Sequence, residues 1–324
     1  MTPNTFHLDP PQFIDSQDGL IAAAKDLLAE KRLAVDTEAN SLFAYQEQVC
    51  LIQISTPKDD FIIDTMALED LSLLAGIFQD PTVEKIFHAS EYDILIMHEE
   101  FDFEFQNLFD TMLAAQILGR KKLGLDALLE EYIGIQVNKK YQRSNWGKRP
   151  IPADMLKYAQ VDTHFLFTIR DKLDQELKKK GFTRIAEEDF KRACQVHGQT
   201  RNEKIEPCWR IQGSKKLSPQ KAAVLQELCR YRDDAARKMN QPPFKVLGAQ
   251  SLIRLAESCP KSVPQLLKLD LPGKKVIKRH GEGLVQAIKK GLNNPPLFPP
   301  KREKVDESFL AREKALRNWR KKTA

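Results

Sequence analysis

Cysteine is scarce in this chain, and its five copies follow no metal-binding or disulfide pattern. They are odd in number and scattered, and no two of them form a C-x-x-C pair. These absences argue against a zinc site and against a disulfide framework. We therefore expect reduced thiols and a cytoplasmic location. The five residues are Cys50, Cys194, Cys208, Cys229 and Cys259.

Long hydrophobic runs are also missing. No stretch approaches the roughly 20 apolar residues that a membrane-spanning helix needs. Residues 1–11 have no basic start followed by an apolar run, so we expect no secretory signal and no membrane partner. Hydrophobic residues make up 42% of the chain, which excludes a disordered or collagen-like protein and leaves material for a sizeable core.

Charge is divided unevenly along the 324 residues, a length that suggests two domains. Residues 1–210 hold 25 Lys and Arg against 35 Asp and Glu, whereas residues 211–324 hold 26 against 10. Proteins that bind phosphates concentrate Lys and Arg on one module. The basic half is therefore either a nucleic-acid-binding module or a solvated basic surface.

The first half predicts a mixed sheet of five strands with flanking helices, an α/β fold. Short polar stretches separate the first three apolar runs, so these are expected to be antiparallel neighbours. The expected strands cover residues 33–35, 49–54, 61–63, 83–87 and 108–109. The expected helices cover residues 68–78, 90–97, 111–118, 125–132 and 153–177.

The second half predicts a small all-helical domain, because prolines repeatedly interrupt its apolar segments. The tail after residue 300 is highly charged and forms either an amphipathic helix or a frayed end. We expect a catalytic domain in residues 1–178, a connecting helix and linker in 179–212, the helical domain in 213–294, and the tail in 295–324.

Asp162 is a carboxylate within an apolar stripe. Met155, Ala159 and Leu166 recur at helical spacing around it, with Tyr158 one turn earlier on the same side. A carboxylate on a buried face is costly unless it is paired or binds a metal ion. Asp162 therefore either meets a buried arginine or backbone donor, or belongs to a functional site.

Three further carboxylates, the pair Asp36 and Glu38 and the single Asp93, are in unusual positions. Asp36 and Glu38 end an apolar strand and leave the same face of the sheet, where their charges repel unless a cation lies between them. A strand end that emerges into water is the alternative. Asp93 lies close to the core side of its helix, or it completes a capping box that Ser90 begins.

A cluster of carboxylates without a His or Cys ligand pattern suits Mg²⁺ or Mn²⁺. Four acids around one cleft suggest a two-metal phosphoryl-transfer site, in which one ion activates a water and the other stabilises the leaving oxygen.

Three motifs in order resemble those of ribonuclease D and related 3′→5′ exonucleases. They are Asp36-Thr37-Glu38, the segment from His88 to Asp93, and the Y-x-x-x-D segment from Tyr158 to Asp162. The resemblance covers residues 10–178 and includes Phe109-Asp110-Thr111 and the segment from Trp146 to Pro150. A sister subclass places a histidine five residues before the last aspartate, where this chain has Lys157. The tyrosine subclass is therefore favoured.

This resemblance implies an RNase H-like fold and a 3′→5′ exoribonuclease that releases nucleoside 5′-monophosphates. Asp36, Glu38, Asp93 and Asp162 would hold two divalent ions, Mg²⁺ or Mn²⁺, and Tyr158 would orient the attacking water. The implied substrates are tRNA precursors or other structured RNA 3′ ends, processed by a monomer. A DNA exonuclease with the same chemistry and an inactive nucleic-acid-binding adaptor are the alternatives. We interpret His88 and Asp110 as structural.

The basic half resembles the HRDC domain, which RecQ-type helicases and ribonuclease D share. The pattern runs from Leu225 through Tyr231-Arg232 to Leu252-Ile253, with Tyr231 where the family usually has tryptophan. A candidate phosphate-binding patch, which is otherwise a solvated helix face, consists of Lys274, Lys275, Lys278 and Arg279. In the first half, Arg149 is expected to contact nucleic acid, and Trp146 either stacks on substrate or packs in the core.

Overall fold

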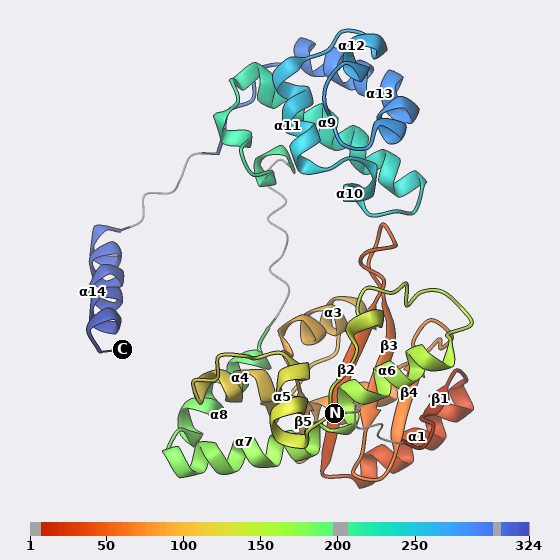
Figure 1. The fold of residues 1–324 in the computed structure, drawn as a ribbon, viewed down its shortest axis with the longest axis vertical. Coiled ribbons are helices and arrows are strands. Elements are labelled where there is room, and N and C mark those ends of the chain that lie inside the picture. The colour runs from red at the N-terminus through yellow and green to blue at the C-terminus, as the bar shows by residue number, and fades with distance from the viewer. Residues whose placement is uncertain (1–7, 197–206, 301–305, 324) are drawn as a thin grey trace. The chain divides into compact units, whose positions relative to one another are not determined.

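A computed structural model describes residues 8–196, 207–300 and 306–323 (Figure 1). Its contacts divide the chain into two compact units, one of residues 1–201 with 236–242 and the other of the remaining residues. The first unit holds a mixed sheet with helices, and the described part of the second is helical. The domain boundaries expected at residues 178, 212 and 294 stay predictions.

The sheet has six strands in the order β1-β4-β3-β2-β5-β6. Strands β2, β3 and β4 pair antiparallel, while the other three pairings are parallel. The strands are β1 (Gln12–Ile14), β2 (Arg32–Ala39), β3 (Val49–Ser55), β4 (Asp60–Asp64), β5 (Glu84–Phe87) and β6 (Leu108–Asp110). The sequence predicted five strands, and β1 is the sixth. Its three residues show no strand pattern in the sequence, and only their pairing with β4 defines them as a strand.

The helices of the first unit include one that sequence patterns did not indicate, α1 (Gln17–Ala29). Ser16 caps it by accepting a hydrogen bond from the backbone N–H of Gly19 at 3.3 Å. The others are α2 (Ser72–Gln79), α3 (Glu91–Phe101), α4 (Thr111–Ile117), α5 (Leu125–Ile133), the 3₁₀ turn η1 (Lys139–Tyr141), α6 (Ala153–His164), α7 (Leu166–Lys180) and α8 (Thr183–Ala193).

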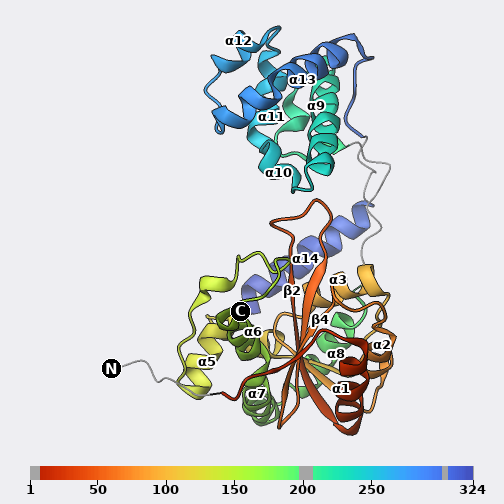
Figure 2. The ribbon, with the colours of Figure 1, turned by 90° about the vertical axis from the view of Figure 1, so that its right-hand side faces the viewer.

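The two faces of the sheet are covered differently (Figure 2). On one face Val35, Ile52 and Ile54 pack with α1 and α2 in the main hydrophobic core. On the other face Leu51 and Ile62 pack with Met155 and Ala159 of α6. Side chains alternate along a strand, so this second face also receives Asp36 and Glu38.

The segment expected to form one helix over residues 153–177 is two helices, α6 and α7, which meet at Phe165. Its apolar residues therefore belong to different clusters. Ala159 lies in the α6 cluster, Leu166 packs with Ala34 and Ile86, and Ile169 joins the main core. The change of direction places α7 against α4, α5 and β5, whereas α6 stays on the sheet.

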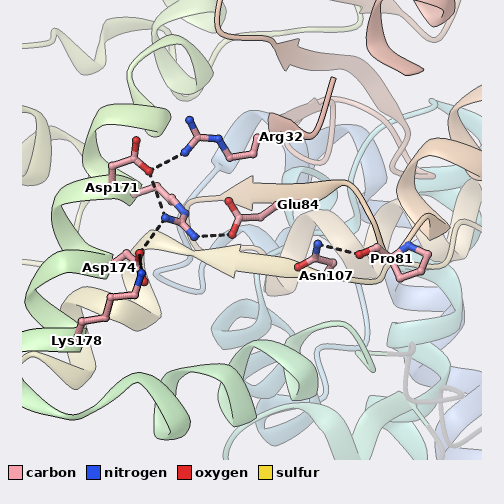
Figure 3. Close-up of polar contacts among 8 residues, drawn as sticks. Arg32, Pro81, Glu84, Asn107, Asp171, Asp174 and Lys178 are labelled. Carbon is pink, nitrogen blue, oxygen red and sulfur yellow. Dashed lines mark hydrogen bonds and ion pairs between the residues drawn. The ribbon is translucent and has the colours of Figure 1, made fainter. Parts of the chain in front are cut away.

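Ion pairs fasten α7 to the starting ends of β2 and β5 (Figure 3). Arg170 pairs with Glu84 at 2.7 Å and with Asp174 at 3.1 Å, and Arg32 pairs with Asp171 at 2.7 Å. The Arg170 guanidinium also lies over the ring of Phe109, 4.8 Å from its centroid. This network lies at the opposite end of β2 from Glu38.

The second unit is built around α9 (Pro219–Lys238) and α13 (Lys274–Asn293). Gly291 permits a close approach of the two helices, because a Cβ there would lie 2.4 Å from the Cα of Val224. The other helices are the 3₁₀ turns η2 (Pro207–Arg210) and η3 (Ser214–Lys216), α10 (Pro243–Val246), α11 (Ala249–Ser258), α12 (Val263–Leu267) and α14 (Glu307–Thr323). In the tail, residues 295–300 form no helix or strand, whereas α14 is helical with Phe309 and Trp319 exposed.

Within the described ranges, no helix combines the length and apolar character that crossing a bilayer requires.

Candidate active site

Strand β2 presents two of the predicted ligands beneath α6. Asp36 and Glu38 alternate along β2 and stand opposite Gln53 and Leu51 of β3. The Met155 and Ala159 side chains of α6 pack on Leu51 in the same cluster. The two carboxylates therefore lie at the edge of the interface between α6 and the sheet, half-buried.

Helix α6 brings Tyr158 and Asp162, one turn apart, to the same region. Polar contacts on its other side fix its rotation. Thr163 Oγ1 lies 2.7 Å from Ser55 Oγ, and Gln160 donates to the Asp60 carboxylate at 2.7 Å. His164 Nδ1 lies 2.8 Å from the same carboxylate, so this histidine has a structural partner away from the acids.

Helix α3 supplies Asp93, which is 7% exposed. The Thr37 hydroxyl, between Asp36 and Glu38 in the chain, donates a hydrogen bond to the Asp93 carboxylate. Ser90 stands at the start of α3, but its hydroxyl donates to Asp110 at 2.8 Å and caps nothing. The capping-box alternative for Asp93 is therefore wrong.

Asp110 and His88 hold the turn that leads into α3. The Asp110 carboxylate accepts from the backbone N–H groups of Ser90 and Met112, each at 2.8 Å, and N-caps α4. Ala89 in this turn has a φ of 62°, and its N–H also donates to Asp110. His88 Nδ1 lies 2.9 Å from Thr111 Oγ1. Both residues thus have structural partners, although His88 also lines the cleft described below, and their structural role stays a prediction.

Burial raises the pKa values of all four acids, and neighbouring charges raise those of Asp36, Glu38 and Asp162 further. Burial raises the pKa of Asp36 well above its ordinary value, and the charges of the other three raise it further. Burial followed by the charge of Asp162 does the same for Glu38. Burial raises the pKa of Asp162 to about 7, with a contribution from the charge of Asp93. These directions mean that the carboxylates are close enough to repel one another.

Tyr158 has no acidic role in this setting. Burial raises the pKa of its hydroxyl, and the neighbouring charges of Asp162 and Glu38 raise it further. The phenol is therefore protonated at neutral pH and can donate a hydrogen bond.

A cleft of about 720 Å³ joins most of these groups. Asp36, Glu38, Tyr158 and Asp162 line it, and Asp93 lies behind it, bonded to Thr37. The opposite wall is the segment around η1, whose Lys139 and Lys140 were not singled out from the sequence. Lys157 of α6 lines it as well. In the sequence, the only indication that Lys139 and Lys140 line the site was their closeness to the segment from Trp146 to Pro150.

Aromatic residues surround the ring of Tyr158. Trp146 packs at 6.2 Å between ring centroids and Tyr141 at 6.0 Å. Trp146 is 1% exposed, so of its two alternatives the structure favours core packing.

Arg149 is engaged inside the protein. Its Nε and Nη2 each donate to the Asp64 carboxylate at 2.6 Å, and its Nη1 donates to the Trp146 carbonyl at 2.5 Å. The carbonyls of Cys50 and Lys148 accept its remaining bonds. All five N–H donors of the guanidinium are thus used, which opposes the expectation that Arg149 contacts nucleic acid.

On α13 the basic residues Lys275, Lys278 and Arg279 are exposed, with spacings that place them on one helix face. The side chain of Lys274, the fourth member of the expected patch, lies outside the described residues.

The donor set fits divalent ions. In the described ranges none of the four acids forms an ion pair with a lysine or arginine, and hard oxygen ligands suit Mg²⁺ and Mn²⁺. In the same ranges, no three His, Cys, Asp or Glu side chains are already gathered as a formed metal centre.

Together, the sheet, the α6 cover and the four acids define a DEDD-type 3′–5′ exonuclease with an RNase H-like fold. A family model described as 3′-5′ exonuclease matches residues 11–178, and an HRDC domain model matches residues 221–288. The exonuclease family depends on divalent metal ions. The chain belongs to this family, in its group of ribonuclease D-like and RRP6-like proteins.

Solved structures and curated proteins show the same similarity. The catalytic core of RRP6 from Trypanosoma brucei has a TM-score of 0.77 and 30% identity, over 90% of this chain and 82% of that chain. Escherichia coli RNase D, described as an exoribonuclease involved in structured RNA processing, has a TM-score of 0.72 and 27% identity, over 96% and 84%. Exosome complex component 10 of Mus musculus is 33% identical over 261 residues, which are 78% of this chain and 29% of that protein.

Proposed function

We propose that this protein is a metal-dependent 3′→5′ exoribonuclease that releases nucleoside 5′-monophosphates by a two-metal-ion mechanism. The observation that carries the proposal is the convergence of Asp36, Glu38, Asp162 and Tyr158 on one cleft. Two divalent ions, Mg²⁺ or Mn²⁺, held by these acids and Asp93 would make hydroxide available near neutral pH and stabilise the leaving oxygen.

The protein's own groups bind and orient the reactants. The protonated Tyr158 hydroxyl donates a hydrogen bond to the attacking water and directs it in line with the last phosphodiester. Lys140 and Lys157, on the cleft wall, provide positive charge for the phosphates of the strand. Trp146 and Tyr141 hold the Tyr158 ring in place.

The substrate that we propose is the 3′ end of structured RNA, such as a tRNA precursor, acted on by a monomer. Support comes from the description of E. coli RNase D and from the HRDC domain model that matches residues 221–288 of the same chain.

The test is hydrolysis of 5′-labelled single-stranded RNA and of the matching DNA, with Mg²⁺, with Mn²⁺ and with chelator. We expect a ladder that shortens from the 3′ end of RNA and disappears with chelator. Faster shortening of DNA would replace the RNA proposal by a DNA exonuclease. Binding without shortening of either strand would support the adaptor.

The matched variant is Asp162→Asn, which keeps the shape of the side chain and removes one repelling charge. We expect hydrolysis to fall by at least about a thousandfold, because the carboxylates act as a unit. Its melting temperature in chelator should equal or exceed that of the wild type, since the lost charge is destabilising there. An active Asp162→Asn enzyme would remove this residue from the site.

A further inference from the structure

Gln53, in the middle of β3, is a buried amide without a partner. Its side chain is 0% exposed, and within the described ranges neither Nε2 nor Oε1 forms a hydrogen bond. Buried amides almost always have partners, because removing them from water without a bond is costly. This orphaned amide therefore needs an explanation.

Two other polar side chains under α6, Ser55 and Gln160, have partners. Ser55, two residues along the same strand, donates to Asp60 at 2.5 Å and contacts Thr163. Gln160, also a buried glutamine, donates to the Asp9 carbonyl at 2.8 Å and to Asp60. Gln53 thus differs from Ser55 and Gln160. In the α6 cluster the Trp146 Nε1 also has no hydrogen bond within the described ranges, but Gln53 leaves both a donor and an acceptor unpaired.

The strand register places Gln53 beside the first acid of the site. Gln53 and Asp36 are direct partners in the antiparallel pairing of β3 with β2. Side chains in such a pair share a face, with Cβ atoms roughly 5 Å apart. A glutamine amide, which extends beyond its Cβ by two further carbons, can reach the neighbouring carboxylate from there.

Asp36 lacks a side-chain hydrogen-bond donor of the kind that Asp93 has. The Asp93 carboxylate receives the hydroxyl hydrogen bond of Thr37. In the described residues the Asp36 carboxylate receives no hydrogen bond from a side chain, and on its β3 side it faces Gln53. One acid therefore has a side-chain donor that fixes its orientation, and the other has an unused donor next to it.

We propose that Gln53 is a positioning residue for metal binding. Its Nε2 donates to one oxygen of Asp36 and so directs the other oxygen toward the cleft when a divalent ion is bound. Partners of this kind orient a ligating carboxylate and raise metal affinity by about 10- to 100-fold. The inference rests on the proposed function, because it assigns Asp36 to the ion.

The test compares Gln53→Met with Ser55→Ala in the full chain. Methionine keeps the length and volume of glutamine and removes the amide, whereas Ser55→Ala removes a partnered hydroxyl from the same strand and face. Two quantities are measured for each protein: the melting temperature in chelator, and the Mn²⁺ concentration at half of the Mn²⁺-induced rise in that temperature. The Mg²⁺ dependence of hydrolysis is recorded beside them.

For Gln53→Met we expect an unchanged or higher melting temperature in chelator and a half-saturating Mn²⁺ concentration raised by about tenfold or more. For Ser55→Ala we expect a lower melting temperature and a half-saturating concentration within about twofold of the wild type. A Gln53→Met value within about twofold of the wild type would overturn the proposal. A wild type that neither responds to Mn²⁺ nor shortens RNA would instead overturn the proposed function.

Discussion

At the scale of single residues, the site is a set of carboxylates that form no ion pair with a lysine or arginine of the described part of the chain. Asp36, Glu38 and Asp162 line one cleft. Asp93 does not line it, but its carboxylate accepts a hydrogen bond from the hydroxyl of Thr37, which does. Their raised pKa values express the cost of burying these charges beside one another without a counter-charge. This cost makes the region ready to bind divalent ions.

The Tyr158 hydroxyl can be tested separately from the carboxylates. Tyr158→Phe removes one oxygen and keeps the ring between Trp146 and Tyr141. We expect the turnover rate to fall by about 100-fold, the scale of a lost orienting or proton-handling group. The Mn²⁺-induced rise in melting temperature should stay as in the wild type. Unimpaired turnover would remove Tyr158 from the mechanism.

The pKa values of Asp93 and Asp162, both raised to about 7, predict a pH dependence of stability. Between pH 4 and 7 these groups are protonated in the folded chain and ionised in the unfolded one. Their contribution to stability is therefore present at pH 4 and is lost as pH rises through 7. In chelator, we expect the melting temperature of the wild type to fall over this range more steeply than that of Asp162→Asn.

Divalent ions should reverse this trend, because they bind the ionised carboxylates. The stabilisation by Mn²⁺ should grow as pH rises from 5.5 to about 8. Equal stabilisation at both ends of the range would contradict the assignment of these acids to the ion.

At the scale of elements, the site depends on how α6 and the segment before it are attached to the sheet. Arg149 makes two bonds to Asp64, whose side chain is 4% exposed, at the end of β4. The neighbouring Trp146 packs in the same cluster as Met155 and Ala159 of α6. The ion pair thus fixes a segment that packs against Tyr158.

Replacing Arg149 decides between this role and substrate contact. Arg149→Met leaves the buried Asp64 carboxylate without its cation and with only the bond from the Met66 backbone N–H, which should cost about 3 kcal/mol of unfolding free energy. Adding Asp64→Asn should recover part of that loss, as measured by urea unfolding. An unchanged urea midpoint together with weaker RNA binding would instead support the nucleic-acid contact expected from the sequence.

At the scale of the whole molecule, the chain joins an acidic catalytic half to a basic one. Carboxylates repel a polyanion in the absence of metal, whereas a basic surface attracts it and can retain RNA near the site. Exposed Lys275, Lys278 and Arg279 on one face of α13 are candidates for that task. A solvated helix face is the alternative.

The salt dependence of RNA binding separates these alternatives. Changing Lys275, Lys278 and Arg279 to Gln should weaken binding and reduce the slope of log affinity against log salt by about 2, the value for three phosphate contacts on a single strand. Removing three charges at Lys178, Lys179 and Arg184 controls for net charge and should leave the slope nearly unchanged. Equal slopes for both triple variants would reject the patch.

The sequence alone was enough to predict the family and the overall fold. The strand-first order, the D-x-E and Y-x-x-x-D motifs and the basic helical half depend on residues within a few positions of one another, which local patterns express. The class of fold, the exonuclease family and the HRDC domain are all confirmed. The metal ligands and the role of Tyr158 stay predictions.

Only the tertiary structure decided the features that depend on distant partners. Strand β1 exists through its pairing with β4, and Phe165 divides α6 from α7 because the two helices pack on different surfaces. Arg149 is paired with a residue 85 positions away, and Gln53 stands opposite Asp36 through the strand register. Such contacts leave no local pattern in the chain, because burial and partnership are set by which strands and helices meet.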